Sequence, residues 1–178
     1  MMLDDAADPS TLVAVVVANA FALSMVVYTA ANISNGHLVG SVMACLFLKV
    51  ATVAQHVPVH GIPQEMTGFG ASILEGVMTF DMVYTVYVAS DPRHGPLGAI
   101  GPLGIEFIGG SNVLASGPFM DRSMNSAYSF GFALVGGSFK NHVVYWFGPW
   151  IGVALAGILY DNVVFPIQVP GIADGVRV

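Results

Sequence analysis

Hydrophobic residues gather in five long runs along the chain, and short polar segments separate them. The runs cover residues 12–31, 38–55, 66–89, 96–117 and 143–165. An α-helix needs about 20 apolar residues to cross the hydrocarbon core of a bilayer. The pattern therefore predicts an all-α membrane protein with five spanning helices.

A sixth apolar run, residues 124–135, is much shorter and follows the polar residues Asp121, Arg122 and Ser123. It is too short to cross a bilayer, and it begins with polar residues where a helix has free N–H groups and the positive end of its dipole. Such a half-helix is tolerated in a membrane only where it is buried in protein or lines a water-filled cavity. The run predicts a re-entrant half-helix at a pore or transport site.

Composition agrees with a membrane protein and excludes several other classes. The chain is 55% hydrophobic and 9% charged, whereas a soluble domain has about 25% charged residues. Five Lys and Arg residues and a net charge of −6 leave no basic patch for nucleic acid. The acidic start lacks the basic region of a signal peptide. The single cysteine, Cys45, allows no intrachain disulfide, and we expect it to be a small buried residue.

Few residues suggest chemistry. No nucleophile–base pair, phosphate loop or metal spacing is present, so we expect no enzyme activity, no cofactor and no metal. The five histidines fall between the apolar runs, where we expect them to be solvated. Glu75, Asp81 and Glu106 lie inside the runs, and ionisable residues there are costly and mark functional sites by default. For Asp81 and Glu106 a proton or cation site and a merely polar pocket both remain open.

From residue 66 to residue 166 the chain resembles one family. The segments that carry the resemblance are ASILEGVMTF (71–80), VYTVYVASDPR (83–93), SNVLASGPF (111–119), SMNSAYSFG (123–131) and GSFKNHVVYWFGPWIG (137–152). They resemble the plant aquaporins of the major intrinsic protein family, and among these the tonoplast intrinsic proteins. The segments SVMACLFLKV (41–50) and EMTGFGAS (65–72) are most similar to the fifth subgroup.

The resemblance implies an aquaporin-like bundle of two inverted halves. Each half has three helices and one half-helix led by an Asn-Pro-Ala box, and the two asparagines donate hydrogen bonds to water in single file. The second box reads Asn125, Ser126 and Ala127, and the loss of the proline should loosen the helix start. The first half-repeat is incomplete, because AANISNGH (30–37) approaches the first box but the box and its half-helix do not follow.

We therefore expect a single membrane domain over residues 1–178. It would comprise an incomplete first half-repeat (1–65), a complete second half-repeat (66–166) and a loose tail (167–178).

The resemblance also implies a selectivity constriction at Asn19, Val113, Arg122 and Tyr128. Asn19 and Val113 suit the subgroup. Arg122 stands where a small residue is usual, and Tyr128 stands where the family has arginine or, in the subgroup, cysteine. Two bulky side chains would narrow the constriction, or Arg122 would supply the cation that position 128 has lost. Glu75 is implied to brace the backbone of the second box loop.

The function that the resemblance implies is passive transport of water or small neutral solutes such as glycerol, urea or ammonia. The location would be the vacuolar membrane of a plant, with a tetramer in the lipid bilayer. The alternative is a non-conducting remnant or an interaction subunit of such a tetramer, because a chain with one box cannot form the paired asparagines by itself.

Overall fold

The computed structural model describes residues 37–52, 57, 59–95 and 100–164, with seven further positions between residues 10 and 21. Its main helices are α2 (His37–Ala51), α3 (Gly68–Ser90), α4 (Ile100–Ser116), α5 (Ser126–Gly136) and α6 (Val144–Leu159). Two shorter elements follow α3 and α6. They are the 3₁₀ turn η1 (Pro92–His94) and the π-helical turn η2 (Tyr160–Val164). No strand occurs in these ranges, so the all-α prediction is confirmed.

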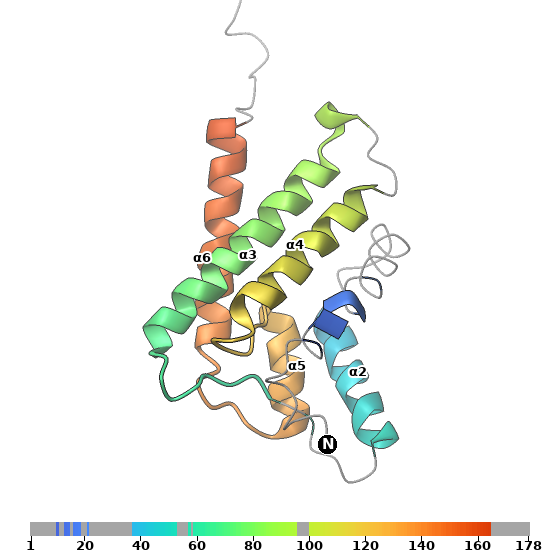
Figure 1. Cartoon of the computed structure of the whole chain (residues 1–178), viewed down its shortest axis with the longest axis vertical. Coiled ribbons are helices and arrows are strands. Elements are labelled where there is room, and N and C mark those ends of the chain that lie inside the picture. Colours follow the sequence, from blue (N-terminus) through green and yellow to red (C-terminus); the bar gives the residue numbers. More distant parts are fainter. Residues whose placement is uncertain are drawn as a thin grey trace, which may run out of the picture.

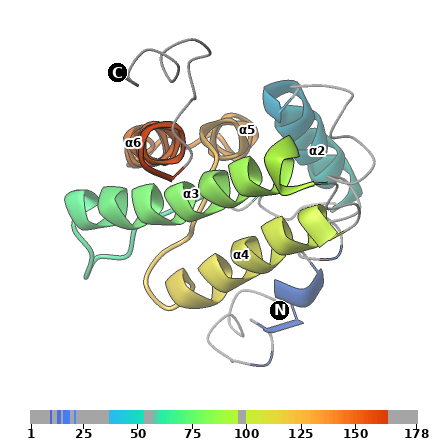
Figure 2. The ribbon, with the colours of Figure 1, turned by 90° about the horizontal axis from the view of Figure 1, so that it is seen from above.

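The long helix α3 lies at the centre of the described bundle. It packs against α6 on one side and α4 on the other, and the short helix α5 packs against α2 and α6 (Figures 1 and 2). The view from above places α5 and α6 side by side, across α3 from α4. This arrangement carries the start of α5 into the interior between the longer helices.

The crossing of α3 and α6 depends on glycines. A Cβ atom at Gly148 would lie 2.7 Å from Cβ of Glu75, and one at Gly152 would collide with the backbone of Gly76. The two glycines of α6 are four residues apart, so they lie on the same face of the helix. Their small size brings the two backbones into contact, which is the usual role of small residues between membrane helices.

The short helix α5 is held by α2 at both ends. The Ser41 hydroxyl donates to the carbonyl oxygen of Ala127 at 2.7 Å, and Lys49 Nζ donates to that of Val135 at 3.4 Å. Gly131 faces Ser41 so closely that a Cβ there would lie 2.6 Å from its hydroxyl oxygen. Lys49 thus places its charge at the negative end of the α5 dipole, where a cation is stabilising.

Large apolar side chains cover the outer surfaces of the helices. On α6 they are more than half exposed at Phe147, Trp150, Ile151, Leu155 and Ile158. Cys45 on α2, by contrast, is 1% exposed, as expected for a small buried residue. Apolar outer faces around a bundle of this kind are the surfaces that lipid tails or neighbouring subunits cover.

The far end of α3 is tied to the end of the last helix. Asp91 accepts hydrogen bonds from the backbone N–H and the Nε of Arg93, at 2.8 Å and 2.9 Å, and from the hydroxyl of Tyr160. The Arg93 side chain, followed by the Tyr160 hydroxyl, holds the pKa of Asp91 well below its usual range. The Arg93 guanidinium also lies over the Tyr160 ring, 5.8 Å from its centroid.

The bounds of α3 and α5 differ from the predicted apolar runs by one or two residues at each end. The last run divides into α6 and the π-helical η2. Among the described residues no helix combines the length and the mean hydropathy required of a membrane span. Most of the first run and the whole tail from residue 167 lie outside the described residues.

Candidate functional site

The start of α5 is capped by the first residue of the altered box. Asn125 is the N-cap, and its side-chain oxygen accepts hydrogen bonds from the backbone N–H groups of Ala127 at 3.0 Å and Tyr128 at 3.4 Å. Ser126 is the first helical residue. Because the side-chain oxygen is engaged by the helix, the amide nitrogen of Asn125 is the end that can donate to another group. It makes no hydrogen bond to any described residue.

The loop before the cap is braced from α3. Glu75 is fully buried, and its two carboxylate oxygens accept hydrogen bonds from the backbone N–H groups of Ser123 at 2.6 Å and Met124 at 2.8 Å. The sequence singled out this contact between Glu75 and the loop. Both oxygens are used on consecutive N–H groups, so one carboxylate satisfies two buried donors that no helix or strand can reach.

The braced loop has an unusual backbone. Met124 adopts a φ of +53°, a left-handed conformation that non-glycine residues rarely take. The hydroxyl of Ser123 donates to the carbonyl oxygen of Asn125 at 2.5 Å, and Asn112 Nδ2 lies 3.4 Å from the Met124 sulfur. These contacts fix the loop where the chain turns from α4 into α5. The strain is thus held by the surrounding structure, as is common at functional sites.

Three of the four proposed constriction residues fall in the described chain. Val113 on α4 is buried, with 4% exposed, and Tyr128 lies in the first turn of α5. Arg122 interacts electrostatically with Tyr128, and its Nε is buried without a hydrogen bond to the described part of the chain. Asn19 lies outside the described residues. Arg122 and Tyr128 therefore come together, and the placement of all four as one constriction stays a prediction.

A histidine that the sequence did not single out joins this group. The His60 ring centroid lies 5.2 Å from that of Tyr128 and 5.4 Å from those of Phe132 and Tyr145. Its Nδ1 is buried and has no hydrogen-bond partner in the described chain. Burial lowers the pKa of His60 to about 4, and the positive charge of Arg122 acts in the same direction. His60 is therefore neutral at physiological pH.

The prediction that the loop histidines are solvated is wrong for His60 and His142. The His142 ring lies 5.2 Å from that of Phe139, its Nε2 is buried, and burial lowers its pKa. The side chains of His37, His56 and His94 lie outside the described residues. Both exceptions occur where a loop folds back onto aromatic residues, and neighbouring residues in the sequence do not reveal such a contact.

Tyr145 ties the loops around the site together. Its ring is fully buried, and its hydroxyl lies 2.9 Å from the carbonyl oxygens of both Gly61 and Asp121. Gly61 N–H in turn donates to the Asp121 carboxylate at 3.2 Å. The loop before α3 and the loop before α5 are thus joined through the first turn of α6.

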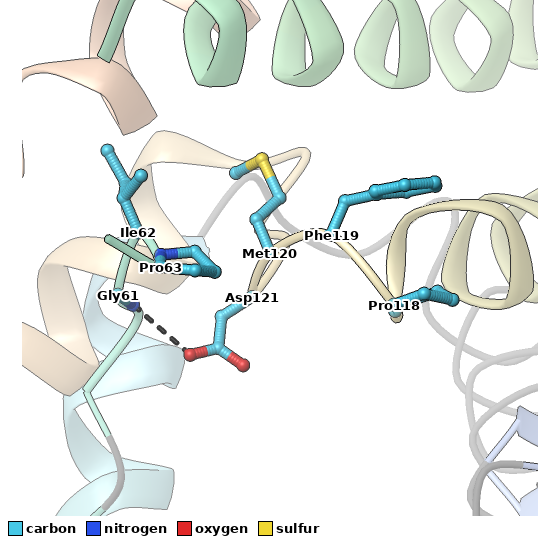
Figure 3. A pocket seen from close by; sticks show the side chains of 8 residues that line it. Gly61, Ile62, Pro63, Pro118, Phe119, Met120 and Asp121 are labelled. Atoms are coloured by element: carbon cyan, nitrogen blue, oxygen red, sulfur yellow. Dashed lines mark hydrogen bonds between the residues drawn. The ribbon is translucent and has the colours of Figure 1, made fainter. Parts of the chain in front are cut away.

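A cavity lies between these two loops. Its volume is about 330 Å³, and Figure 3 shows the residues that line it, with the hydrogen bond from Gly61 to Asp121 at its edge. The lining residues are Gly61, Ile62, Pro63, Gly117, Pro118, Phe119, Met120 and Asp121. The last of them directly precedes Arg122 in the sequence, but none of the proposed constriction residues lines the cavity.

The described ranges contain no group of three His, Cys, Asp or Glu side chains that could hold a metal ion. What the site offers is a set of fixed hydrogen-bonding groups. These are the amide nitrogen of Asn125, the imidazole of His60, the phenol of Tyr128 and the guanidinium of Arg122. Hydrogen-bonding groups near the start of a half-helix are typical of the architecture of a membrane channel.

Comparison with known proteins agrees with this architecture. A family model described as "Major intrinsic protein" matches residues 38–160. A probable aquaporin TIP5-1 of Arabidopsis thaliana is 47% identical, with 94% of this chain and 76% of the relative covered. A probable aquaporin TIP-type RB7-18C of Nicotiana tabacum is 44% identical, with 94% and 78% covered. A probable aquaporin TIP5-1 of Oryza sativa is 41% identical, with 92% and 74% covered. The chain belongs to the major intrinsic protein family.

The alignments also show that the chain is shorter than its relatives within the matched region. The match to the Arabidopsis thaliana protein extends over 195 positions, which is more than the 178 residues of the whole chain. The relative therefore has residues inside the aligned region that this chain lacks. The incomplete first half-repeat stays a prediction, because the alignment length gives the number of these residues and not their place in the chain.

Proposed function

We propose that this protein is a channel that passes water and small neutral solutes such as glycerol, urea or ammonia across a membrane without energy input. The orientation of Asn125 carries the proposal. Its side-chain oxygen is held by the N–H groups of Ala127 and Tyr128, so its amide nitrogen is fixed as a donor at the start of the half-helix. A donor fixed in this way replaces one hydrogen bond that a water molecule loses when it leaves bulk water.

The same part of the structure supports the exclusion of cations. The N-terminal end of α5 carries the positive end of the helix dipole. Arg122 adds a full positive charge beside Tyr128, on the loop that leads into this helix. We propose that Asn19, Val113, Arg122 and Tyr128 form the constriction, and that Glu75 keeps the box loop in place.

Membership of the family places the protein in the lipid bilayer as a multi-pass integral membrane protein, and we locate it in the vacuolar membrane, the tonoplast. We further propose that it assembles into homo- or hetero-tetramers. We propose that the protein has no catalytic activity and binds neither a cofactor nor nucleic acid. The division into half-repeats, 1–65 and 66–166, and the tail, 167–178, belongs to the same proposal.

A non-conducting remnant, or an interaction subunit of a tetramer, is the second candidate. It is favoured by the residues that the relatives have and this chain lacks inside the aligned region. Within the described ranges α5 is the one helix led by a box of this kind. A chain with one such helix cannot by itself place two asparagines opposite each other.

Osmotic swelling of proteoliposomes tests the proposal. Vesicles holding the purified, monodisperse protein should swell faster than empty vesicles. In the Asn125→Leu variant, the permeability that the protein adds to the vesicles should be about tenfold lower. The reason is the loss of one hydrogen bond to the solute, worth about 1.4 kcal/mol.

Asn162→Leu is the matched control, since Asn162 is exposed in η2 and lies far along the chain from the box. It should swell like the unaltered protein. If the folded, inserted protein swells no faster than empty vesicles, the channel proposal fails and the second candidate stands.

A further inference from the structure

A second polar residue lies on the face of α4 that carries Val113. Glu106 precedes Val113 by seven residues, which is within 20° of two full helical turns and about 10 Å along the axis. Both residues are buried, with 4% of each exposed. If Val113 lines the conduction path, as proposed above, Glu106 lines it as well, farther from the constriction.

The Glu106 carboxylate lies next to Gly109, one turn farther along α4. A Cβ atom at Gly109 would lie 3.0 Å from the Met82 methyl group of α3 and 3.8 Å from a carboxylate oxygen of Glu106. One at Gly110 would lie 3.1 Å from a methyl group of Val16. The carboxylate therefore lies near Met82 of α3.

The Glu106 carboxylate has no partner in the described chain. No hydrogen bond or ion pair joins it to another described residue, although Glu75, the other deeply buried glutamate, uses both of its oxygens. The Glu106 side chain as a whole is 4% exposed. Ionisable residues inside membrane segments are costly and mark solute pathways by default.

We propose that Glu106 is a solute-binding residue of the conduction path, and that it accepts hydrogen bonds from small neutral solutes that carry paired N–H groups, such as urea. The inference rests on the proposed channel function. Two parallel N–H groups match the two oxygens of a carboxylate. The solute thus meets donors at the box, from Asn125, and acceptors about two helical turns beyond the constriction, from Glu106.

Urea and water permeabilities of the same proteoliposomes test the assignment. In Glu106→Leu the urea permeability should fall about tenfold, and by a larger factor than the water permeability, because urea loses two paired acceptors at once. Glu106→Gln keeps one acceptor oxygen and should retain most of the urea permeability. Equal urea permeability of the unaltered protein and Glu106→Leu would overturn the assignment.

Accessibility to a water-soluble reagent tests the position of Glu106 without relying on solute flow. In a Cys45→Ala background, Glu106→Cys should react with a small charged methanethiosulfonate. Phe107→Cys, at a neighbouring position of α4 that is 65% exposed on the outer surface, should react at least about tenfold more slowly, because a lipid-facing thiol is shielded from water. Equal, slow reaction at both positions overturns the inference.

The outcomes separate the two proposals. Faster swelling in water with no effect of Glu106→Leu on urea rejects the role of Glu106 and leaves the channel in place. No swelling of the unaltered protein rejects the channel, and the role of Glu106 with it.

Discussion

At the scale of single residues, the buried carboxylate of Glu75 and the side-chain oxygen of Asn125 have related roles as hydrogen-bond acceptors for the backbone. Each accepts hydrogen bonds from two backbone N–H groups that the helices leave without a partner. Glu75 holds the loop at Ser123 and Met124, and Asn125 holds the first turn of α5. The proline expected in the family's box is absent, and the capping oxygen of Asn125 provides the helix start that proline would otherwise favour.

Replacing Glu75 tests how far the loop depends on it. Glu75→Gln places an NH₂ group against one of the two N–H groups, so one buried donor loses its partner, and the protein should lose about 1–3 kcal/mol of stability. Glu75→Leu removes both acceptors and should cost about twice as much. Thermal unfolding in detergent measures both changes.

Glu65→Gln is the control for the Glu75 variants. Glu65 is exposed in the loop before α3, so the same change of chemistry should shift the stability by no more than about 0.5 kcal/mol. A Glu75→Gln variant as stable as this control would show that the carboxylate does not hold the loop.

At the scale of elements, the crossing of α3 and α6 sets the position of Glu75. The carboxylate stands on α3 at the point where Gly148 of α6 comes closest. Gly152 and Gly76 continue the contact one turn farther on. Because the helices touch through their backbones, a change of one methyl group at this crossing moves α3, and with it the brace of the box loop.

Gly152→Ala should therefore destabilise the protein by about 1–3 kcal/mol, the usual cost of adding a methyl group to a close-packed contact. Gly157→Ala lies on the same helix, but its Cβ would make only an ordinary contact with the Tyr87 hydroxyl, at 3.7 Å. This control should be neutral, or stabilising by up to about 1 kcal/mol, because alanine favours a helix more than glycine does. Equal melting temperatures for the two variants would contradict the close crossing.

At the scale of the whole molecule, loops from three parts of the chain meet around His60. Tyr145 joins the loop before α3 to the loop before α5, and the His60 ring packs against Tyr128 and Phe132 of α5. The contacts of His60 with α5 and of Tyr145 with Gly61 join residues more than 60 positions apart in the sequence. The site is therefore a product of the assembled bundle, and acid should weaken it.

Acid is expected to lower the stability of the folded protein through His60. Its folded pKa, about 4, is below the value of about 6.5 for an unfolded chain, so below pH 6.5 the unfolded state binds a proton that the folded state does not. Stability should fall between pH 6.5 and pH 4, by about 2 kcal/mol at pH 5. The lowered pKa of His142 acts in the same direction.

Thermal unfolding in detergent at pH 7.5 and pH 5 measures this loss. The His60→Phe variant keeps an aromatic ring and has no group that titrates there, so it should show a smaller loss on acidification. An identical loss in both proteins would mean that His60 is protonated as easily when folded as when unfolded.

The sequence by itself determined the class of fold and the family, because apolar periodicity, low charge and the segments of residues 66–166 are local properties. It also pointed to Glu75, since a charge inside an apolar run requires a partner, and the resemblance to the family pointed to Asn125. Only the tertiary structure decided the surroundings of His60 and the hydrogen bond from Lys49 to the end of α5. It also showed that Glu106 has no hydrogen-bond partner among the described residues. These depend on which distant segments pack together, and hydrogen bonds and burial between distant segments leave no periodic pattern along the chain.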